Sequence, residues 1–164
     1  MIKSPKQLSL RSKKVLMRVD FNVPLKNGQV QDQYRIKSSL PTIKYCLRRG
    51  ASIILCSHLG RPNGKNVEGM SLVSVGETLA DLLEMPIKFS VDCISEDSHD
   101  VTLGLKPGEV HLLENLRFHK GETENDPSFS SQLAKHGDVF INDAFGTSHR
   151  SHASNVGVVP FFTQ

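Results

Sequence analysis

The sequence predicts an α/β domain: a three-layer, Rossmann-like arrangement in which a mainly parallel sheet is covered by helices on both faces. Short apolar runs alternate with longer amphipathic segments along the 164 residues, a pattern typical of parallel sheets built from strand–helix–strand units. The run at 52–56 is almost continuously apolar, as in strands buried on both faces. The length suits one domain whose core needs no disulfide or metal.

Five apolar runs are predicted to form the strands, and the segments between them the helices and loops. The strands are expected over 15–19, 52–56, 87–89, 110–113 and 139–141. Between the first two, Asn27-Gly28 predicts a small hairpin. The helix that follows is expected to have Pro41 in its first turn and to end at Gly50. Periodic apolar residues predict further helices over 73–84, weakly over 95–105, and over 129–136, with loops over 61–70 and 120–128.

Composition narrows the function classes. Twenty Lys and Arg against 17 Asp and Glu give a net charge of +3, which is too mild to indicate nucleic-acid binding. No run approaches the ~18 apolar residues of a membrane span. The basic segment 1–6 is followed by no apolar stretch, so a secretory signal is not expected. The scattered Cys46, Cys56 and Cys93 indicate buried thiols in a reducing compartment, so the expected location is cytoplasmic.

Polar and positively charged residues follow four of the five predicted strands, and a further arginine precedes the first helix. Ligands bind at the carboxyl ends of the strands in open parallel sheets. Several guanidinium groups at one edge favour a small, multiply charged anion, because they pair bidentately with phosphate and carboxylate. The site is therefore predicted to take a small hydroxylated phospho-acid. The candidate residues are Asp20, Asn22, Arg35, His58, Arg61, Arg117 and Arg150.

Structural alternatives exist for some of these residues. Asp20 could simply form an Asx turn, and His58 could be a hydrogen-bonded histidine at a strand end. Cys56 fits a buried thiol better than a nucleophile. His149 and His152 have a spacing that could hold zinc, but no cysteine is near them.

Four segments closely resemble signatures of the phosphoglycerate kinase family. They are 16–24 (LMRVDFNVP), 57–62 (SHLGRP), 113–118 (LENLRF) and 142–147 (NDAFGT), and residues 35–43 are similar to a further family segment. The matches occur in order along nearly the whole chain. The resemblance implies a two-domain glycolytic kinase that transfers a phosphoryl group between 1,3-bisphosphoglycerate and ADP, giving 3-phosphoglycerate and ATP.

The resemblance also implies a role for each candidate residue. Asp20 and Asn22 would contact the hydroxyl and carboxyl end of the substrate. Arg35, the catalytic member, would stabilise the transferring phosphoryl group, since this chemistry depends on positioning and charge neutralisation. Arg117 and Arg150 would bind the 3-phosphate. The remaining pocket residues would be His58 and Arg61.

Residues 1–164 correspond in the resemblance to the N-terminal, substrate-binding domain, without the C-terminal domain that binds most of the Mg-ATP or Mg-ADP. We therefore expect a monomer that binds 3-phosphoglycerate or 1,3-bisphosphoglycerate, holds no cofactor itself and is inactive alone. It should bind neither nucleic acid nor membrane.

Two other functions remain open. The chain could be a non-catalytic anion-binding or interaction module derived from a shortened kinase. It could also be a phosphatase similar to the haloacid dehalogenases, since Asp20-x-Asn22 resembles their Asp-x-Asp motif. Asn22 and the single late carboxylate of Asp143 argue against the phosphatase.

Overall fold

The computed structural model describes residues 9–144 and 151–162, and its centre is a five-stranded sheet in the order β5-β6-β4-β1-β7. Each neighbouring pair of these described strands runs parallel. The predicted α/β architecture is confirmed, with strand ends shifted by one residue in places. The strands are β1 (Lys14–Arg18), β4 (Ser52–Cys56), β5 (Lys88–Ser90), β6 (Val110–Leu113) and β7 (Val139–Asn142).

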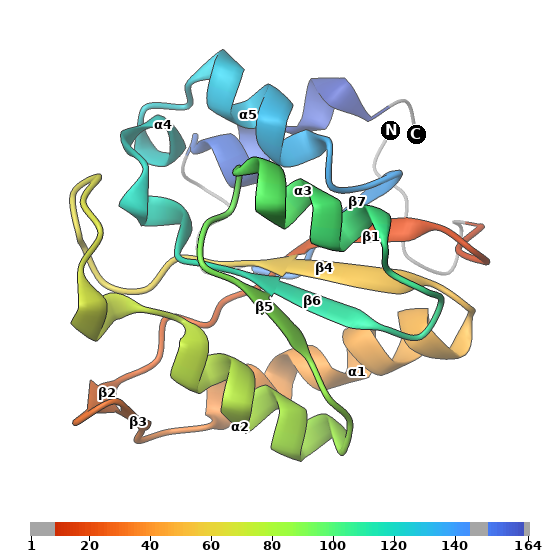
Figure 1. Ribbon diagram of the computed structural model, residues 1–164, viewed down its shortest axis with the longest axis horizontal. Helices are drawn as coiled ribbons and strands as arrows, with labels where there is room; N and C mark the ends of the chain where they lie inside the picture. Colours follow the sequence, from red (N-terminus) through yellow and green to blue (C-terminus); the bar gives the residue numbers. More distant parts are fainter. Residues whose placement is uncertain (1–8, 145–150, 163–164) are drawn as a thin grey trace.

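Helices cover both faces of the sheet, as predicted (Figure 1). On one face lie α1 (Tyr34–Arg48) and α2 (Val73–Leu83). On the other lie α3 (Glu96–Leu103), α4 (Lys120–Thr123), α5 (Pro127–Ala134) and the short π-helical segment η5 (Ala153–Gly157). Three single-turn 3₁₀ helices complete the described elements: η2 (Glu68–Met70), η3 (Leu116–Phe118) and η6 (Val159–Phe161).

Alternate residues of the central strands enter two separate hydrophobic cores. Val15 and Met17 of β1 belong to the core beneath α1 and α2, whereas Leu16 between them belongs to the core beneath α3 and α5. All three side chains are fully buried. The same alternation holds in β4, where Ile53 and Ile54 point to opposite cores. The continuous apolar runs therefore reflect burial on both faces.

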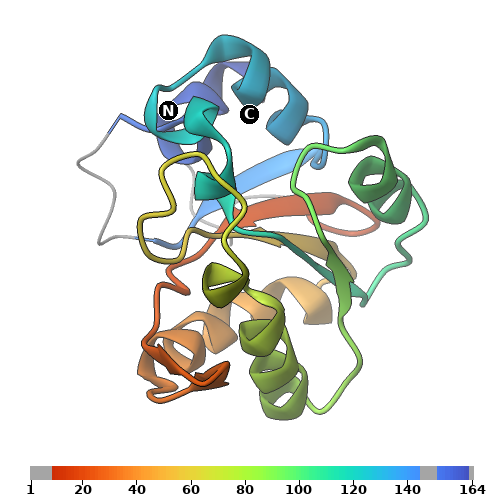
Figure 2. The ribbon, with the colours of Figure 1, turned by 60° about the vertical axis from the view of Figure 1, so that its left-hand side comes forward.

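The path of the chain brings the ends of four strands to one edge. From β1 the chain goes to the neighbouring β4, passes over one position to β5, returns to β6 between them, and then crosses to β7 on the other side of β1. Later strands are thus added on both sides of β1, and ligands bind at the carboxyl ends of the strands where the strand order reverses in this way. The loops after β1 and β4 and the short helices after β6 gather at this edge, which Figure 2 brings forward.

The predicted hairpin is present between β1 and α1. Strands β2 (Leu25–Lys26) and β3 (Gln29–Val30) pair antiparallel. Asn27 and Gly28 both have positive φ, of 53° and 73°, as a two-residue turn of this type requires.

Two predicted boundaries are wrong. Helix α1 begins at Tyr34, so Pro41 lies inside the helix and not in its first turn. Proline in a helix interior removes one backbone hydrogen bond, but Ile36 and Ile43 are fully buried on either side of Pro41 and pack the helix onto the sheet. Helix packing thus outweighs the local preference of proline.

The predicted loop over 120–128 contains α4 and the start of α5. Helix α5 begins earlier than predicted because Asp126 is its N-cap. The carboxylate of Asp126 accepts a hydrogen bond of 2.8 Å from the Phe129 amide, and Pro127 occupies the first turn. Both are standard start signals.

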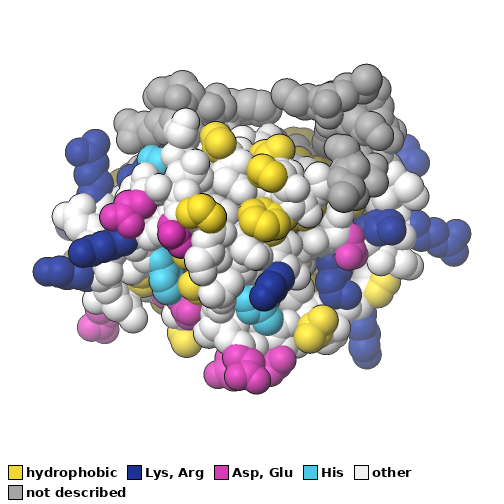
Figure 3. Space-filling view, turned by 90° about the horizontal axis from the view of Figure 1, so that it is seen from above, with side chains coloured by type: hydrophobic (Ala, Val, Ile, Leu, Met, Phe, Trp, Pro, Cys, Tyr) yellow, Lys and Arg dark blue, Asp and Glu magenta, His cyan; other side chains and the backbone are white. Residues whose placement is uncertain are grey.

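All three cysteines are buried and free of disulfides, as predicted. Within the described ranges, no helix is long and apolar enough to cross a membrane. On the face that carries α3 and α5, hydrophobic side chains lie interspersed with polar and charged ones (Figure 3).

Candidate anion-binding site

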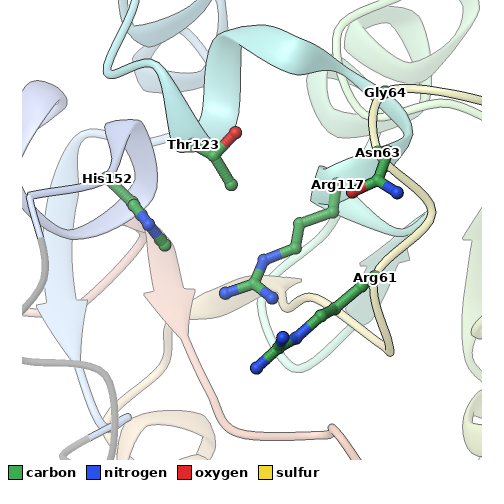
Figure 4. A pocket seen from close by; sticks show the side chains of 6 residues that line it. All are labelled: Arg61, Asn63, Gly64, Arg117, Thr123 and His152. Atoms are coloured by element: carbon green, nitrogen blue, oxygen red, sulfur yellow. The ribbon is translucent and has the colours of Figure 1, made fainter.

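A pocket of about 200 Å³ lies at the carboxyl edge of the sheet. The guanidinium groups of Arg61 and Arg117 lie side by side in it, and His152 approaches from the opposite side (Figure 4). None of the described residues that line the pocket carries a carboxylate. Two adjacent guanidinium groups favour an anion with several oxygens. The other lining residues are Asn63, Gly64 and Thr123.

Arg117 is positioned by the buried side chain of Asn115, which follows β6. Asn115 Oδ1 accepts hydrogen bonds from the amides of Arg117 (3.0 Å) and Leu59 (3.2 Å). Its Nδ2 donates to the carbonyl oxygens of Leu59 (2.7 Å) and Met70 (3.0 Å). This amide thereby uses its full hydrogen-bonding capacity. It joins the loop after β4, which carries Arg61, to the turn that carries Arg117.

The neighbouring Glu114 fixes the far end of the same loop. Its Oε1 accepts from the Leu72 amide at 2.8 Å, and its Oε2 accepts from the Ser71 hydroxyl at 2.6 Å. These groups lie directly before α2, so the carboxylate satisfies helix-start donors that would otherwise lack partners. The segment after β4 is therefore held to the end of β6 at two points.

A second cluster lies where β1 ends. Arg35, in the first turn of α1, donates from Nη1 to the carbonyl oxygen of Asn22 at 2.6 Å and lies 3.4 Å from Asp20 Oδ1. Asp20 Oδ1 also accepts from the Asn22 amide at 3.2 Å, so Asp20 forms the Asx turn and faces Arg35 as well. The Arg35 side chain is 49% exposed. Solvent weakens such an ion pair, so the guanidinium can exchange it for a ligand.

Gly60 connects this cluster to the pocket. Its amide donates to Asn22 Oδ1 at 2.9 Å, and its carbonyl oxygen accepts from Arg117 Nη1 at 3.4 Å. Its φ of +64° lies in the left-handed region, which glycine adopts without steric cost. Asp20, Asn22, Arg35 and Arg117 thus lie around one short loop, the loop that also carries Arg61.

His58, at the end of β4, is buried, and its Nδ1 lies 2.7 Å from Nη2 of Arg18. One ring nitrogen therefore has a structural partner, as expected if His58 is a hydrogen-bonded histidine at a strand end. Arg18 is 1% exposed, and sequence reasoning missed it because a charged residue inside an apolar strand gives no indication of what it faces.

The remaining predicted residues have different outcomes. Arg150 and His149 lie outside the described residues. His152, Thr123 and Asn63 line the pocket but were not among the predicted site residues. His152 was noted among the polar residues after the last predicted strand and weighed as half of a zinc pair; its place after that strand was the signal that could have marked it as a site residue.

The thiols fit a structural role. Burial raises the pKa of Cys56 to about 12, so its reactive thiolate is scarce at neutral pH. This agrees with the interpretation of Cys56 as a buried thiol.

The described lining of the pocket has no carboxylate for a magnesium ion. Mg²⁺ prefers oxygen ligands in octahedral geometry, and the side-chain oxygens in this described lining are those of Asn63 and Thr123. The one ligand cluster found among the described residues is Asp92, Cys93 and His119, with ligand atoms within 4.8 Å of one another. Its thiol is a soft ligand that Mg²⁺ does not select, and burial raises the pKa of Cys93 well above its usual range.

Comparison with known proteins agrees with this geometry. The family model described as Phosphoglycerate kinase matches residues 6–164. The chain is 50% identical over 162 residues to a phosphoglycerate kinase of Chloroherpeton thalassium, covering 99% of this chain and 41% of that protein. It is 52% identical over 156 residues to one from Moorella thermoacetica, covering 95% and 40%. The chain thus spans about two-fifths of the length of these relatives.

Solved structures give the same result. The structure of phosphoglycerate kinase from Coxiella burnetii superposes with a TM-score of 0.86 at 36% identity, covering 96% of this chain and 39% of that one. The Pyrococcus horikoshii enzyme gives 0.89 at 31% identity, covering 98% and 41%. The comparisons give no support to the phosphatase alternative.

Proposed function

Because the chain belongs to the phosphoglycerate kinase family, we propose that it binds 3-phosphoglycerate as the substrate-binding part of that enzyme. The complete reaction is phosphoryl transfer between 1,3-bisphosphoglycerate and ADP, giving 3-phosphoglycerate and ATP in glycolysis. On this proposal residues 1–164 form the N-terminal domain, and Mg-ATP or Mg-ADP binds in a part of the protein outside this sequence.

The observation that carries the proposal is the pairing of Arg61 and Arg117 in a pocket whose described lining has no carboxylate. A phosphate has enough oxygens to pair with two adjacent guanidinium groups. Arg150 is proposed to join them at the 3-phosphate.

The cluster at the end of β1 is proposed to hold the other end of the substrate. Asp20 offers acceptors for a hydroxyl group, and Asn22 lies beside it. Arg35 lies close to both, and its exposed guanidinium is proposed to neutralise the phosphoryl group during transfer, where charge stabilisation matters most. His58 is proposed to complete the pocket.

An amide-resolved NMR titration of the chain with 3-phosphoglycerate at low salt tests the proposal. We expect shifts at Asp20, Arg35, His58 and Arg117, stronger than those caused by inorganic phosphate or ATP. Arg117→Gln should weaken binding at least tenfold, since charge-assisted bonds contribute about 1.5–3 kcal/mol each. A matched control is Arg48→Gln, at the exposed end of α1. Equal responses to phosphate and to 3-phosphoglycerate would count against the proposal.

A coupled assay separates the enzyme from a binding module. The chain alone should show no turnover, and addition of a separately produced nucleotide-binding part of a relative should restore it. A monomeric state and a cytoplasmic location are part of the same proposal; the three buried free thiols favour a reducing compartment.

A further inference from the structure

Three side chains with metal-binding atoms lie together near the carboxyl end of β5. They are Asp92, Cys93 and His119, and their ligand atoms all lie within 4.8 Å of one another. Asp92 and Cys93 lie in the loop after β5, whereas His119 lies between η3 and α4. Because β5 and β6 are parallel neighbours, the segments that follow them leave the sheet at the same edge. The sheet topology therefore builds this cluster from two distant parts of the sequence.

The mixture of oxygen, nitrogen and sulfur donors favours zinc over harder cations. Zinc binds carboxylate, imidazole and thiolate in tetrahedral geometry, whereas Mg²⁺ and Ca²⁺ take oxygen ligands. Zinc–ligand distances place tetrahedral donor atoms about 3.3–3.6 Å apart. Asp92 Oδ1 and His119 Nε2 lie 2.5 Å apart as a hydrogen-bonded pair, so zinc would replace the hydrogen between them and separate the two atoms by about 1 Å more. The side chains of Asp92 and His119 are 33% and 31% exposed, which leaves them room for this movement.

The surroundings hold the other two donors of the cluster in place. Cys93 is fully buried, and its carbonyl oxygen accepts from His136 Nε2 at 2.8 Å, which fixes the backbone at this ligand. The His119 ring lies beside the ring of Phe129, with 5.3 Å between the centroids. Contacts of this kind orient metal ligands. Burial and the charge of Asp92 raise the pKa of the Cys93 thiol, but a thiol that coordinates a metal loses its proton.

A second pocket, of about 300 Å³, gives access to the cluster, since His119 and Ile94 line it. The other charged residues in its described lining are Lys120, Glu124 and Asp126. Carboxylates thus outnumber lysines here, and a negative local field raises the concentration of cations. This pocket differs in charge from the candidate anion site. Solvent in it can supply water as a fourth zinc ligand.

We propose that Asp92, Cys93 and His119 form a zinc-binding site with water as the fourth ligand. On binding, the thiol proton of Cys93 goes to solvent. Zinc takes the place of the hydrogen on His119 Nε2, and the neutral ring carries its one hydrogen on Nδ1. The metal then joins the loop after β5 to the segment between η3 and α4. None of the three ligands lines the anion pocket, and the proposal does not rest on binding of 3-phosphoglycerate.

Titration of the metal-free, reduced chain with Co²⁺ at neutral pH tests the site. Tetrahedral Co²⁺ with a thiolate ligand absorbs strongly in the visible and near-ultraviolet ranges. We expect these bands to saturate at one equivalent of Co²⁺ and to disappear when Zn²⁺ displaces the cobalt, whereas excess Mg²⁺ should leave them unchanged. Absence of binding overturns the proposal. Binding without a thiolate-to-cobalt band also overturns it, because the metal then lies elsewhere on the chain.

A cysteine pair shows whether the thiolate comes from Cys93. Cys93→Ser should abolish the thiolate-to-cobalt band and weaken Zn²⁺ binding at least about tenfold, since even partners behind the ligands contribute that much. The matched control is Cys56→Ser, which changes another buried free thiol of the same core outside the cluster. It should alter neither the band nor the affinity.

A carboxylate variant provides a second test if Cys93→Ser does not fold. Asp92→Asn changes a partly exposed side chain and should weaken Zn²⁺ binding at least about tenfold while the thiolate-to-cobalt band remains. The control Asp97→Asn removes an exposed carboxylate of α3 and should leave the affinity unchanged. A folded Cys93→Ser or Asp92→Asn variant that binds Zn²⁺ as tightly as the unaltered chain would contradict the proposal and leave the Asp92–His119 contact as an ordinary ion pair.

Discussion

At the scale of single residues, Gly60 is a sensitive position of the site. A Cβ added there would lie 3.1 Å from Sδ of Met70, on a backbone with φ of +64°. Gly60→Ala should therefore destabilise the fold by about 1–2 kcal/mol, the usual cost of left-handed backbone in a residue with a Cβ. It should also weaken binding of 3-phosphoglycerate several-fold, because the Gly60 amide and carbonyl contact Asn22 and Arg117.

Urea denaturation and the ligand titration together test this prediction. The matched control is Gly69→Ala in the same loop, where a Cβ would meet nothing within 4 Å and no positive φ occurs. If both variants keep wild-type stability and affinity, Gly60 does not set the loop geometry.

The residue types of the site could be predicted from the sequence, but their partners could not. Asp20, Asn22 and Arg35 were predicted as site residues, and they lie together. Their positions follow from the rule that strand ends share one edge. The pairing of Arg18 with Ser154 joins residues 136 positions apart, and no local pattern encodes such a contact. His58 follows β4, and the contact of its Nδ1 with Arg18 joins residues 40 positions apart.

At the scale of elements, α3 is attached to the sheet by a chain of buried hydrogen bonds. The donor and acceptor roles along this chain of hydrogen bonds follow from one end. The Cys93 carbonyl can only accept, so His136 donates to it from Nε2 at 2.8 Å. His136 Nδ1 then accepts from the Thr102 hydroxyl at 2.7 Å. Thr102 Oγ1 in turn accepts from His111 Nδ1 at 3.0 Å, and His111 Nε2 accepts from Ser90 at 2.6 Å. With both rings neutral, every member of this chain has a hydrogen-bond partner.

This arrangement predicts acid sensitivity. Burial, together with the charge of neighbouring histidines, lowers the pKa of His111 to about 3 and that of His136 to about 4. In the unfolded chain both should titrate near 6.5. Between about pH 6.5 and pH 4 the unfolded state binds more protons, so stability falls as pH falls through this window. The loss should be of the order of 3 kcal/mol per histidine when the window is crossed completely.

The urea midpoint measured between pH 7.5 and pH 4.5 tests this prediction. His111→Asn should flatten the pH dependence, even if it lowers stability at pH 7. A slope unchanged by the substitution would show that the acid sensitivity between pH 7.5 and pH 4.5 arises elsewhere.

Helix boundaries show what local signals cannot decide. Pro41 predicted a helix start, yet α1 begins seven residues earlier at Tyr34, because its buried face extends on both sides of the proline. Asp126 and Pro127 were available as start signals in the sequence, and α5 follows them. Capping chemistry therefore determines where α5 begins, whereas tertiary packing determines where α1 begins.

At the scale of the whole molecule, the fold class was predictable but the strand order was not. Alternating strands and helices imply a parallel sheet. The placement of β6 between β5 and β4 depends on which helix packs on which face, and that is set by the two cores together. The sequence gives one sign of the two cores: the runs that form β1 and β4 are too continuously apolar for a sheet buried on one face only.

Because β1 contributes to both cores, the chain should unfold as one cooperative unit. Leu16→Ala removes a fully buried side chain from the core beneath α3 and α5, and such substitutions cost about 2–5 kcal/mol. The loss of stability should extend to the helices on the opposite face of the sheet. Amides of α1 should lose as much protection in native-state hydrogen exchange as amides of α5, since both layers depend on the ladder between β1 and β4. The control Leu103→Ala changes a residue of α3 that is 74% exposed. It should alter neither the stability of the chain nor the amide protection of α1 and α5. Weakening confined to α5 and η5 would mean instead that the two layers open separately and that the sheet with α1 and α2 is stable without them.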